Sequence, residues 1–289
     1  MSSSSKPKKS AEKVEKLRQF NEMQKELKLH GFVYCQALKD MQETLQGKEF
    51  IDTFKTFGPL AAHDGQTAAQ DPLAGHQISS QYRTKMTDWM IEVCTSFKCV
   101  PRTYFLSVTI MDKYLQSSMH NGIVRGNQDI HMMGVISMYL ASKYEDIYPI
   151  HSKVVAEKIA HGAMTQQQIL QKELEFLSLF NFEMNFTTLY DFHETYSDKI
   201  QKQMLHNLVM VDNESDSFLS LSNLLLSHLS SMSLLLLKMA IQCSDFSHYS
   251  QSILTISSLY AATAFIKHSP EFAGPQTNKF IDEVRRIIH

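Results

Sequence analysis

Apolar residues recur every three or four positions along most of the chain, which is the spacing of one face of an α-helix. In Gln81–Lys98 this spacing places Met86, Met90 and Val93 on one face. Asn127–Tyr144 is apolar almost all round and therefore predicts a buried, central helix. The chain has only 10 Gly and 7 Pro in 289 residues, which is sparse turn punctuation for an all-β protein. The pattern predicts an all-α fold.

Five consecutive helices are predicted between residues 79 and 184. Their ranges are Gln81–Lys98, Pro101–Leu115, Asn127–Tyr144, a short helix that ends at Ile159, and Thr165–Phe180. Pro101 stands at the first position of its helix, where a missing N–H is tolerated. Thr165 and Gln168 have the spacing of a capping box at the start of the last helix. Gly134 is small enough to let a neighbouring helix approach the central one closely.

A second helical block is predicted from residue 185 to residue 289. Its helices lie near Thr187–Gln201, Phe218–Cys243, Gln251–His268 and Asn278–His289, with a candidate break near Ser230. Lys199–Ser217 is interpreted as an enlarged loop. Only one helix is expected after His268, so this block is shorter than the first. We therefore expect two related helical units, 79–184 and 185–289.

The N-terminal part has a different composition. Residues 1–30 hold eight Lys or Arg against four Glu and are expected to form a charged, partly disordered tail. Within this tail, the KPKK cluster at residues 6–9 fits either a weak nuclear import signal or a solvated segment. Residues 31–78 are expected to contain one amphipathic helix, Phe32–Leu45, followed by a long loop rich in Gly and Pro.

Charge and polarity exclude several classes of partner. Lys and Arg total 28 while Asp and Glu total 30, so at a net charge of −2 no overall field attracts nucleic acid or anionic lipid. The strongest candidate for a membrane span, Phe218–Cys243, carries six Ser, an Asn, a His and Lys238. These side chains are too polar for a spanning helix without partners, so the segment is interpreted as a core helix. We expect no nucleic acid and no membrane as partner.

No motif for catalysis or for a cofactor is found in the sequence. Neither G-x-G-x-x-G nor G-x-x-x-x-G-K-[ST] occurs, and the kinase triplets His-Arg-Asp and Asp-Phe-Gly are missing. The four cysteines lack C-x-x-C spacing and the thirteen histidines are scattered, so no metal site is expected. We therefore do not expect the chain to be an enzyme or to need a cofactor.

Four sequence motifs follow one another in order between residues 82 and 184. They read YRTKMTDWMIEV, TIMDKYL, MMGVISMYLASKYEDIYPI and TQQQILQKELEFLSLFNFEM. Together they resemble the cyclin box, and their spacing is most similar to that of the mitotic A- and B-type cyclins. The Leu-rich segment and the small-residue helix further on resemble the C-terminal repeat of a cyclin. The resemblance extends, with interruptions, over residues 32–289.

This resemblance implies an all-α protein with two cyclin-like units and a surface that binds a cyclin-dependent kinase. The residues that match the kinase-binding positions are Lys143, Glu173, Tyr144, Leu140 and Phe182. A Lys and a Glu on adjacent helices within an apolar rim could satisfy the backbone groups at the end of a partner's helix. Without the motifs, the same two residues would be interpreted as a solvated ion pair. A further match, Arg83 with Asp112, corresponds to a pair that fixes the fold of cyclins.

A second surface of cell-cycle cyclins, a hydrophobic patch that docks substrates, is matched only in part. Its positions here include Met86, Trp89, Glu92 and Ile130. Lys85 and His131 replace an apolar residue and an amide of the family, and Lys85 would repel a basic ligand. Trp89 taken alone is more typical of a core. Substrate or inhibitor peptides are therefore weaker candidates as partners than the kinase.

These observations predict a regulatory subunit that activates a cyclin-dependent protein kinase and controls cell-cycle progression, in the nucleus and/or the cytoplasm. Binding would move the regulatory helix of the kinase, and phosphate transfer would belong to the partner. The alternative is a cyclin-fold adaptor without kinase activation, similar to transcription factor IIB or to the retinoblastoma protein. The near-neutral charge of the box disfavours DNA binding, and Lys143 with Glu173 favours a kinase.

Overall fold

The computed structural model describes residues 71–209, 216–247 and 249–288. All the described residues belong to one compact unit of the chain. The predicted tail 1–30 and the predicted helix Phe32–Leu45 lie outside the described residues. The domain boundary that the sequence places before residue 185 stays a prediction.

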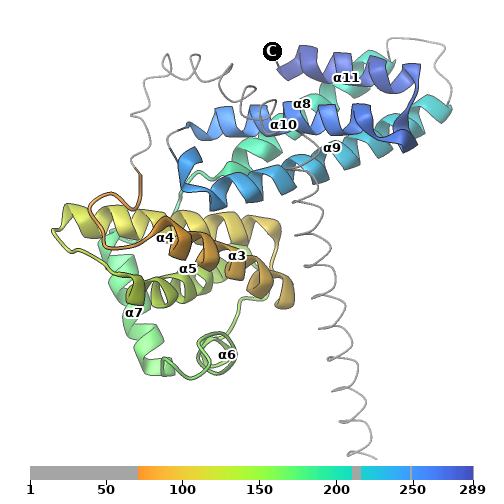
Figure 1. Cartoon of the computed structure of the whole chain (residues 1–289). Helices are drawn as coiled ribbons and strands as arrows, with labels where there is room; N and C mark the ends of the chain where they lie inside the picture. The colour runs from red at the N-terminus through yellow and green to blue at the C-terminus, as the bar shows by residue number, and fades with distance from the viewer. Residues whose placement is uncertain (1–70, 210–215, 248, 289) are drawn as a thin grey trace, which may run out of the picture. The chain divides into compact units, whose positions relative to one another are not determined.

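Every regular element among the described residues is a helix, which confirms the all-α prediction (Figure 1). The first four long helices are α3 (Ser80–Ser96), α4 (Pro101–His120), α5 (Ile130–Glu145) and α7 (Gln166–Leu179). They match four predicted helices closely. α4 differs most, because it continues past the predicted end at Leu115, and Ser118 in the added turn is still buried.

The central position predicted for α5 is confirmed. α5 packs against α3, α4 and α7, and every residue from Met133 to Ser142 is buried. At Gly134 the neighbouring helix α3 comes very close, because a Cβ there would lie only 2.9 Å from the Sδ of Met86. A side chain at this position would therefore force Met86 of α3 to move.

The chain between α5 and α7 is helical but irregular. It consists of α6 (Ser152–Val154) and a five-residue π-helix, η3 (Val155–Ile159), so the predicted short helix that ends at Ile159 is confirmed. The predicted capping box opens α7. The N–H of Gln168 donates to Thr165 Oγ1 at 3.2 Å, and the N–H of Thr165 donates to Gln168 Oε1 at 2.8 Å.

The second group of long helices contains α8 (Leu189–Val209), α9 (Asp216–Gln242), α10 (Gln251–His268) and α11 (Pro275–Ile288). α10 has the predicted range, because the hydroxyl of Ser250 accepts a hydrogen bond from the N–H of Ile253 and caps its start. α10 packs against α8, α9 and α11, so it is the central helix of this group. A single turn, η5 (Pro270–Phe272), precedes α11.

The enlarged loop predicted at Lys199–Ser217 is wrong for the described parts of that stretch, which exclude residues 210–215. α8 continues as a helix to Val209, and α9 already begins at Asp216. Because this stretch is mostly polar, the prediction did not recognise two buried positions in it, Ile200 and Met204, which lie one turn apart on α8. Their burial continues the apolar face of α8 through residues that look like a loop in sequence.

The break predicted near Ser230 is also wrong, because α9 is one continuous helix. Its buried positions recur every three or four residues, at Ser222, Leu225, Leu229, Ser233, Leu236, Leu237 and Ala240. Serine fits this stripe because it is small and because Ser233 donates its hydroxyl proton to the carbonyl oxygen of Ser230 at 3.0 Å. Within the described residues, Ser220–Gln242 is the one helix long and apolar enough to cross a membrane by length and composition, and 33% of its apolar window is buried.

Candidate functional site

Lys143 and Glu173 form an ion pair between α5 and α7. Lys143 lies in the last turn of α5 and Glu173 in the middle of α7, and Nζ and Oε1 are 2.5 Å apart. The side chain of Glu173 is only 11% exposed, whereas that of Lys143 is 45% exposed. The sequence places the two residues on adjacent helices, and the structure brings their charges together at the edge of the core.

The surroundings of Lys143 keep it cationic. Burial alone would lower the pKa of Lys143, but the hydrogen bond and the charge of Glu173 raise it above the ordinary value. Nζ also lies 5.1 Å from the ring centroid of Tyr139, one turn earlier on α5. Leu140, which the resemblance assigns to the kinase-binding set, is 4% exposed and belongs to the core of α5.

Large apolar side chains are exposed on the same elements that carry this ion pair. Twelve such side chains are exposed among the described residues, and half of them lie between residues 144 and 182: Tyr144, Ile147, Tyr148, Leu170, Leu174 and Phe182. They come from the end of α5, the loop after it, α7, and the turn after α7. We call these six side chains, together with Lys143 and Glu173, the α5–α7 surface.

The sequence predicts Tyr144 and Phe182 at this surface and misses the other four apolar side chains. Ile147 and Tyr148 are 87% and 90% exposed, the highest values among them. Two large apolar residues directly before Pro149 could have been the signal, because a proline stops α5 from continuing and leaves them in a loop. Leu170 and Leu174 lie one turn apart on α7 and would have been found by that spacing.

The turn after α7 presents Phe182 from a constrained backbone. φ is +61° at Phe182 and +52° at Asn181, a left-handed conformation that is uncommon outside glycine. The N–H of Phe182 donates to the carbonyl oxygen of Leu177 at 2.8 Å, which closes this turn. The ring is nevertheless 63% exposed. A strained backbone that holds an aromatic ring in solvent is typical of a functional position.

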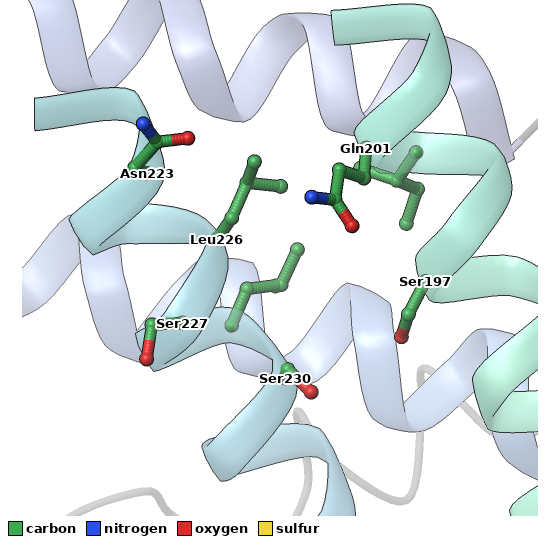
Figure 2. A pocket seen from close by; sticks show the side chains of 8 residues that line it. Ser197, Gln201, Asn223, Leu226, Ser227 and Ser230 are labelled. Carbon is green, nitrogen blue, oxygen red and sulfur yellow. The ribbon is translucent and has the colours of Figure 1, made fainter. Parts of the chain in front are cut away.

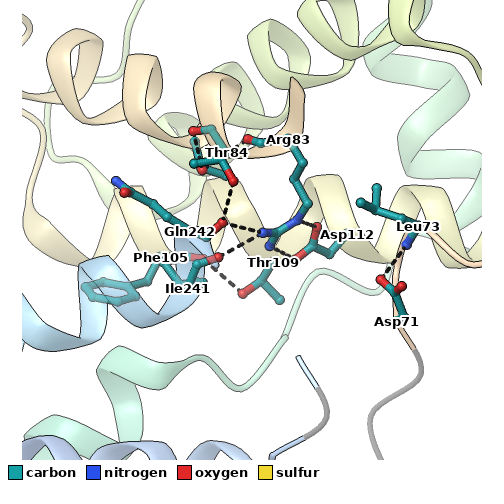
Figure 3. A network of polar contacts seen from close by, with 10 residues as sticks. Asp71, Leu73, Arg83, Thr84, Phe105, Thr109, Asp112, Ile241 and Gln242 are labelled. Atoms are coloured by element: carbon teal, nitrogen blue, oxygen red, sulfur yellow. Dashed lines mark hydrogen bonds and ion pairs between the residues drawn. The ribbon is translucent and has the colours of Figure 1, made fainter. Parts of the chain in front are cut away.

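Arg83 is buried and connects three helices (Figure 3). Its Nε and Nη2 donate to the two carboxylate oxygens of Asp112 on α4, at 2.9 and 2.6 Å. Its Nη1 donates to the carbonyl oxygen of Ile241 at 2.9 Å, and Thr84 Oγ1 donates to that of Gln242 at 3.0 Å. These two carbonyls end α9 and have no partner inside that helix. The predicted pair is formed, and its link to α9 is a contact that sequence reasoning missed.

The residues predicted for a substrate-docking patch lie on α3 and at the first residue of α5, and among them only Glu92 is exposed. They are Met86, Trp89, Glu92 and Ile130. Met86 and Ile130 are 5% and 6% exposed, so they offer little surface to a ligand. Trp89 is half-buried with its ring centroid 5.4 Å from that of His131. Burial lowers the pKa of His131, and the nearby His161 lowers it further.

A hollow of about 380 Å³ opens between α8 and α9 (Figure 2). It is lined by Ser197, Ile200, Gln201, Asn223, Leu226, Ser227, Leu229 and Ser230. This lining carries hydroxyls, amides and aliphatic groups but no ionisable side chain. Elsewhere in the described part of the chain, no group of three or more His, Cys, Asp or Glu side chains could hold a metal ion.

Residues 62–185 match the protein-family model described as the cyclin N-terminal domain. Among curated relatives, G2/mitotic-specific cyclin C13-1 of Daucus carota is 32% identical over 117 residues, which cover 40% of this chain and 32% of the relative. G2/mitotic-specific cyclin-B of Emericella nidulans is 24% identical over 269 residues, which cover 90% of this chain and 50% of the relative. The chain thus spans half or less of the length of these two relatives.

Among solved structures, a viral cyclin from herpesvirus saimiri aligns with a TM-score of 0.49 at 14% sequence identity. The alignment covers 73% of this chain and 86% of that chain. The match to the cyclin N-terminal domain includes the whole of α5 and α7. It therefore contains the α5–α7 surface.

Proposed function

The chain is a member of the cyclin family, and we propose on this premise that it is a regulatory subunit that binds and activates a cyclin-dependent protein kinase. The observation that carries the proposal is the α5–α7 surface, in which a buried carboxylate, its lysine and six exposed apolar side chains lie on two packed helices and the segments that follow them. The names of the relatives support an extension of the proposal to cell-cycle progression, and to mitosis in particular.

The ion pair keeps binding capacity for a partner. Glu173 uses Oε1 for Lys143, and its Oε2 has no hydrogen bond to any described residue. The ammonium of Lys143 has three donors, and Glu173 occupies one of them. The pair can therefore accept a backbone N–H and donate to a backbone carbonyl at the end of a partner's helix. Once the apolar rim excludes water, truncation of one member would cost about 2–5 kcal/mol of binding free energy.

Phe182 and the loop residues Ile147 and Tyr148 supply the apolar part of the proposed interface. Large aromatic and aliphatic side chains at this exposure are unfavourable in water and gain free energy when a partner covers them. The left-handed backbone at Phe182 fixes the direction of its ring before binding, so less conformational freedom is lost when the complex forms.

Activation would be allosteric. A kinase is active when its own Lys–Glu ion pair is complete and its activation loop is released. A partner that binds the active arrangement more tightly than the inactive one shifts the equilibrium toward the active state. In this proposal the chain contributes only that difference in binding free energy, and the kinase catalyses phosphate transfer. The proposed complex acts in the nucleus and/or the cytoplasm.

The proposal can be tested with the full chain and purified cyclin-dependent kinases, taken one at a time. Isothermal titration calorimetry gives the Kd, and phosphotransfer to a peptide substrate gives the activation. The variant Lys143→Ala/Glu173→Ala should weaken binding by a factor of about ten or more. The matched control is Lys153→Ala/Glu157→Ala, which removes an exposed Lys–Glu pair with Nζ and Oε1 3.9 Å apart. That control should leave the Kd within a factor of about two.

The outcomes separate the two candidate functions. Binding and activation by wild type, lost in the first variant and kept in the control, would support the kinase partner. Binding to none of the kinases would contradict the proposal and favour the adaptor alternative. Equal losses in both variants would show that the effect is not specific to the α5–α7 surface and would contradict its role in binding.

A further inference from the structure

A second polar network holds α7 two residues beyond Glu173. The hydroxyl of Tyr114 on α4 donates to Glu175 Oε1 at 2.6 Å. Nη2 of Arg125 donates to the same tyrosine oxygen at 2.5 Å and lies 3.3 Å from Glu175 Oε1. Nζ of Lys172 lies 2.5 Å from Glu175 Oε2, so both carboxylate oxygens have partners. The hydrogen bonds of Tyr114 and Lys172 and the charges of Lys172 and Arg125 outweigh burial and lower the pKa of Glu175.

Tyr114 also touches α7 through its ring. Tyr114 is fully buried, and its ring stacks on that of Phe176 with centroids 3.7 Å apart and planes 7° from parallel. Burial raises the pKa of Tyr114, so its hydroxyl keeps the proton that it donates to Glu175. One side chain of α4 thus contacts two consecutive residues of α7, one by a hydrogen bond and one by stacking.

Arg125 reaches this network from an anchored backbone. Its N–H donates to Nδ1 of His76 at 3.0 Å, and its carbonyl oxygen accepts from the N–H of Gln77 at 2.8 Å. Nε2 of the same histidine bonds to the carbonyl oxygen of Leu115 at 2.9 Å. The guanidinium also lies 5.0 Å from the ring centroid of Tyr114. The charge that meets Glu175 is therefore held in place by the end of α4 and by the segment before α3.

The two polar contacts act on different sides of α7. Successive residues of an α-helix are about 100° apart around its axis, so Glu175 lies about 200° from Glu173. Lys143 of α5 holds one side, and Tyr114 with Arg125 holds the other. Together they hold α7 from two sides and so restrain its rotation about its own axis.

We propose that Tyr114 and Arg125 are positioning residues, which act through Glu175 to set the rotation of α7 and so place Glu173, Leu170 and Leu174 for the partner. This inference rests on the proposed function of the α5–α7 surface. It adds that the surface is pre-organised by residues that do not touch the partner. A loss of this network would leave the surface residues in place but let α7 move.

Hydrogen exchange in the free, full-length chain tests the positioning itself. Tyr114→Phe keeps the stacked ring and removes the hydroxyl, which donates to Glu175 and accepts from Arg125. The amides of α7 should then exchange about tenfold faster, because a hydrogen bond to a charged group is lost, while those of α10 stay unchanged. The matched control is Tyr104→Phe, which removes a hydroxyl from another buried tyrosine of α4 outside this network. Arg125→Met tests the same network while leaving the buried tyrosine intact.

Kinase binding tests whether the positioning matters for the partner. Tyr114→Phe should weaken the Kd about fivefold in the wild-type background but less than about twofold in a Glu173→Ala background, since coupled residues are not additive. An equal loss in both backgrounds would show a general effect on stability and would overturn the inference. The inference would also be overturned if the α7 amides of Tyr114→Phe exchanged no faster than those of Tyr104→Phe, regardless of the result of kinase binding. Absence of kinase binding by wild type would instead contradict the proposed function, and exchange in α7 would still report on the network.

Discussion

The guanidinium of Arg83 donates a hydrogen bond of 2.9 Å to the carbonyl oxygen of Ile241, 158 residues further along the chain. Asp112 accepts hydrogen bonds from the other two nitrogens of the same guanidinium, so one side chain connects α3, α4 and the C-terminal end of α9. Burial alone would lower the pKa of Arg83, but Asp112 raises it, and the side chain stays charged. A cation at the C-terminal end of a helix is favourable because the negative end of the helix dipole lies there.

Arg83→Lys should lower the free energy of unfolding by about 2 kcal/mol or more, because a lysine cannot form the two-pronged contact with Asp112 and reach Ile241 at once. Urea unfolding followed by circular dichroism measures the change. The matched control is Arg286→Lys, which alters an exposed two-pronged contact with Glu283 and should leave the unfolding midpoint unchanged. Equal shifts of the unfolding midpoint in the two variants would show that the burial of Arg83 and its link to α9 do not contribute to stability.

Gly134→Ala should lower the free energy of unfolding by about 1–3 kcal/mol, because the new Cβ would crowd Met86 in the α3–α5 interface. Met86 is 5% exposed and its Sδ would be 2.9 Å away, so the side chain has little room to move. The double variant with Met86→Ala should lose less than the sum of the two single losses. Strictly additive losses in urea unfolding would show that Met86 is not the residue that requires glycine at position 134.

Local sequence signals were sufficient where a helix end is decided by its own residues. α7 begins after Thr165, whose hydroxyl forms the predicted cap, and α10 begins at the predicted residue after Ser250, whose hydroxyl also caps its helix. The prediction failed at Lys199–Ser217, because the polar residues there continue α8 only when Ile200 and Met204 find a buried place against other helices. Burial of that kind depends on packing and cannot be read from local composition.

The candidate site was predictable as a pair of residues but not as a surface. Lys143 and Glu173 could be assigned from the motifs, whereas periodicity does not tell which helix faces meet. The contact between Tyr114 and Glu175 joins residues 61 positions apart, and although both lie inside the quoted motifs, the resemblance assigns neither of them to the kinase-binding set. The exposure of Ile147 and Tyr148 was missed for a related reason, since an apolar residue is expected to be buried until the fold leaves it outside.

His193 should make the stability of the fold depend on pH. It is buried and bonds to Ser233 Oγ at 2.8 Å, and burial lowers its pKa to about 4. In the unfolded chain its pKa is about 6.5, so the unfolded state takes up the proton first as the pH falls. The contribution of His193 to the free energy of unfolding should therefore be complete above about pH 6.5. It should decrease by about 3 kcal/mol as the pH falls to about 4.

Urea unfolding of wild type and His193→Gln across this pH range isolates the contribution of His193. The variant should show a shallower decline, because it removes the group that is neutral in the folded chain and charged in the unfolded one. His151→Gln, at an exposed histidine, should follow the wild-type curve. Parallel curves for wild type and His193→Gln would contradict the assignment.

Phe182→Gly should separate stability from binding. Glycine adopts a φ of +61° without strain, so the free energy of unfolding should stay the same or rise by up to about 1 kcal/mol. The same change removes a ring that is 63% exposed, and kinase affinity should fall about tenfold because buried aromatic anchors dominate such interfaces.

Phe182→Ala is the matched control, since it removes the ring but keeps the strain, and it should lose affinity without gaining stability. Urea unfolding and calorimetry give the two quantities. A loss of stability in both variants would show that the ring supports the fold, and an unchanged Kd would remove Phe182 from the proposed interface.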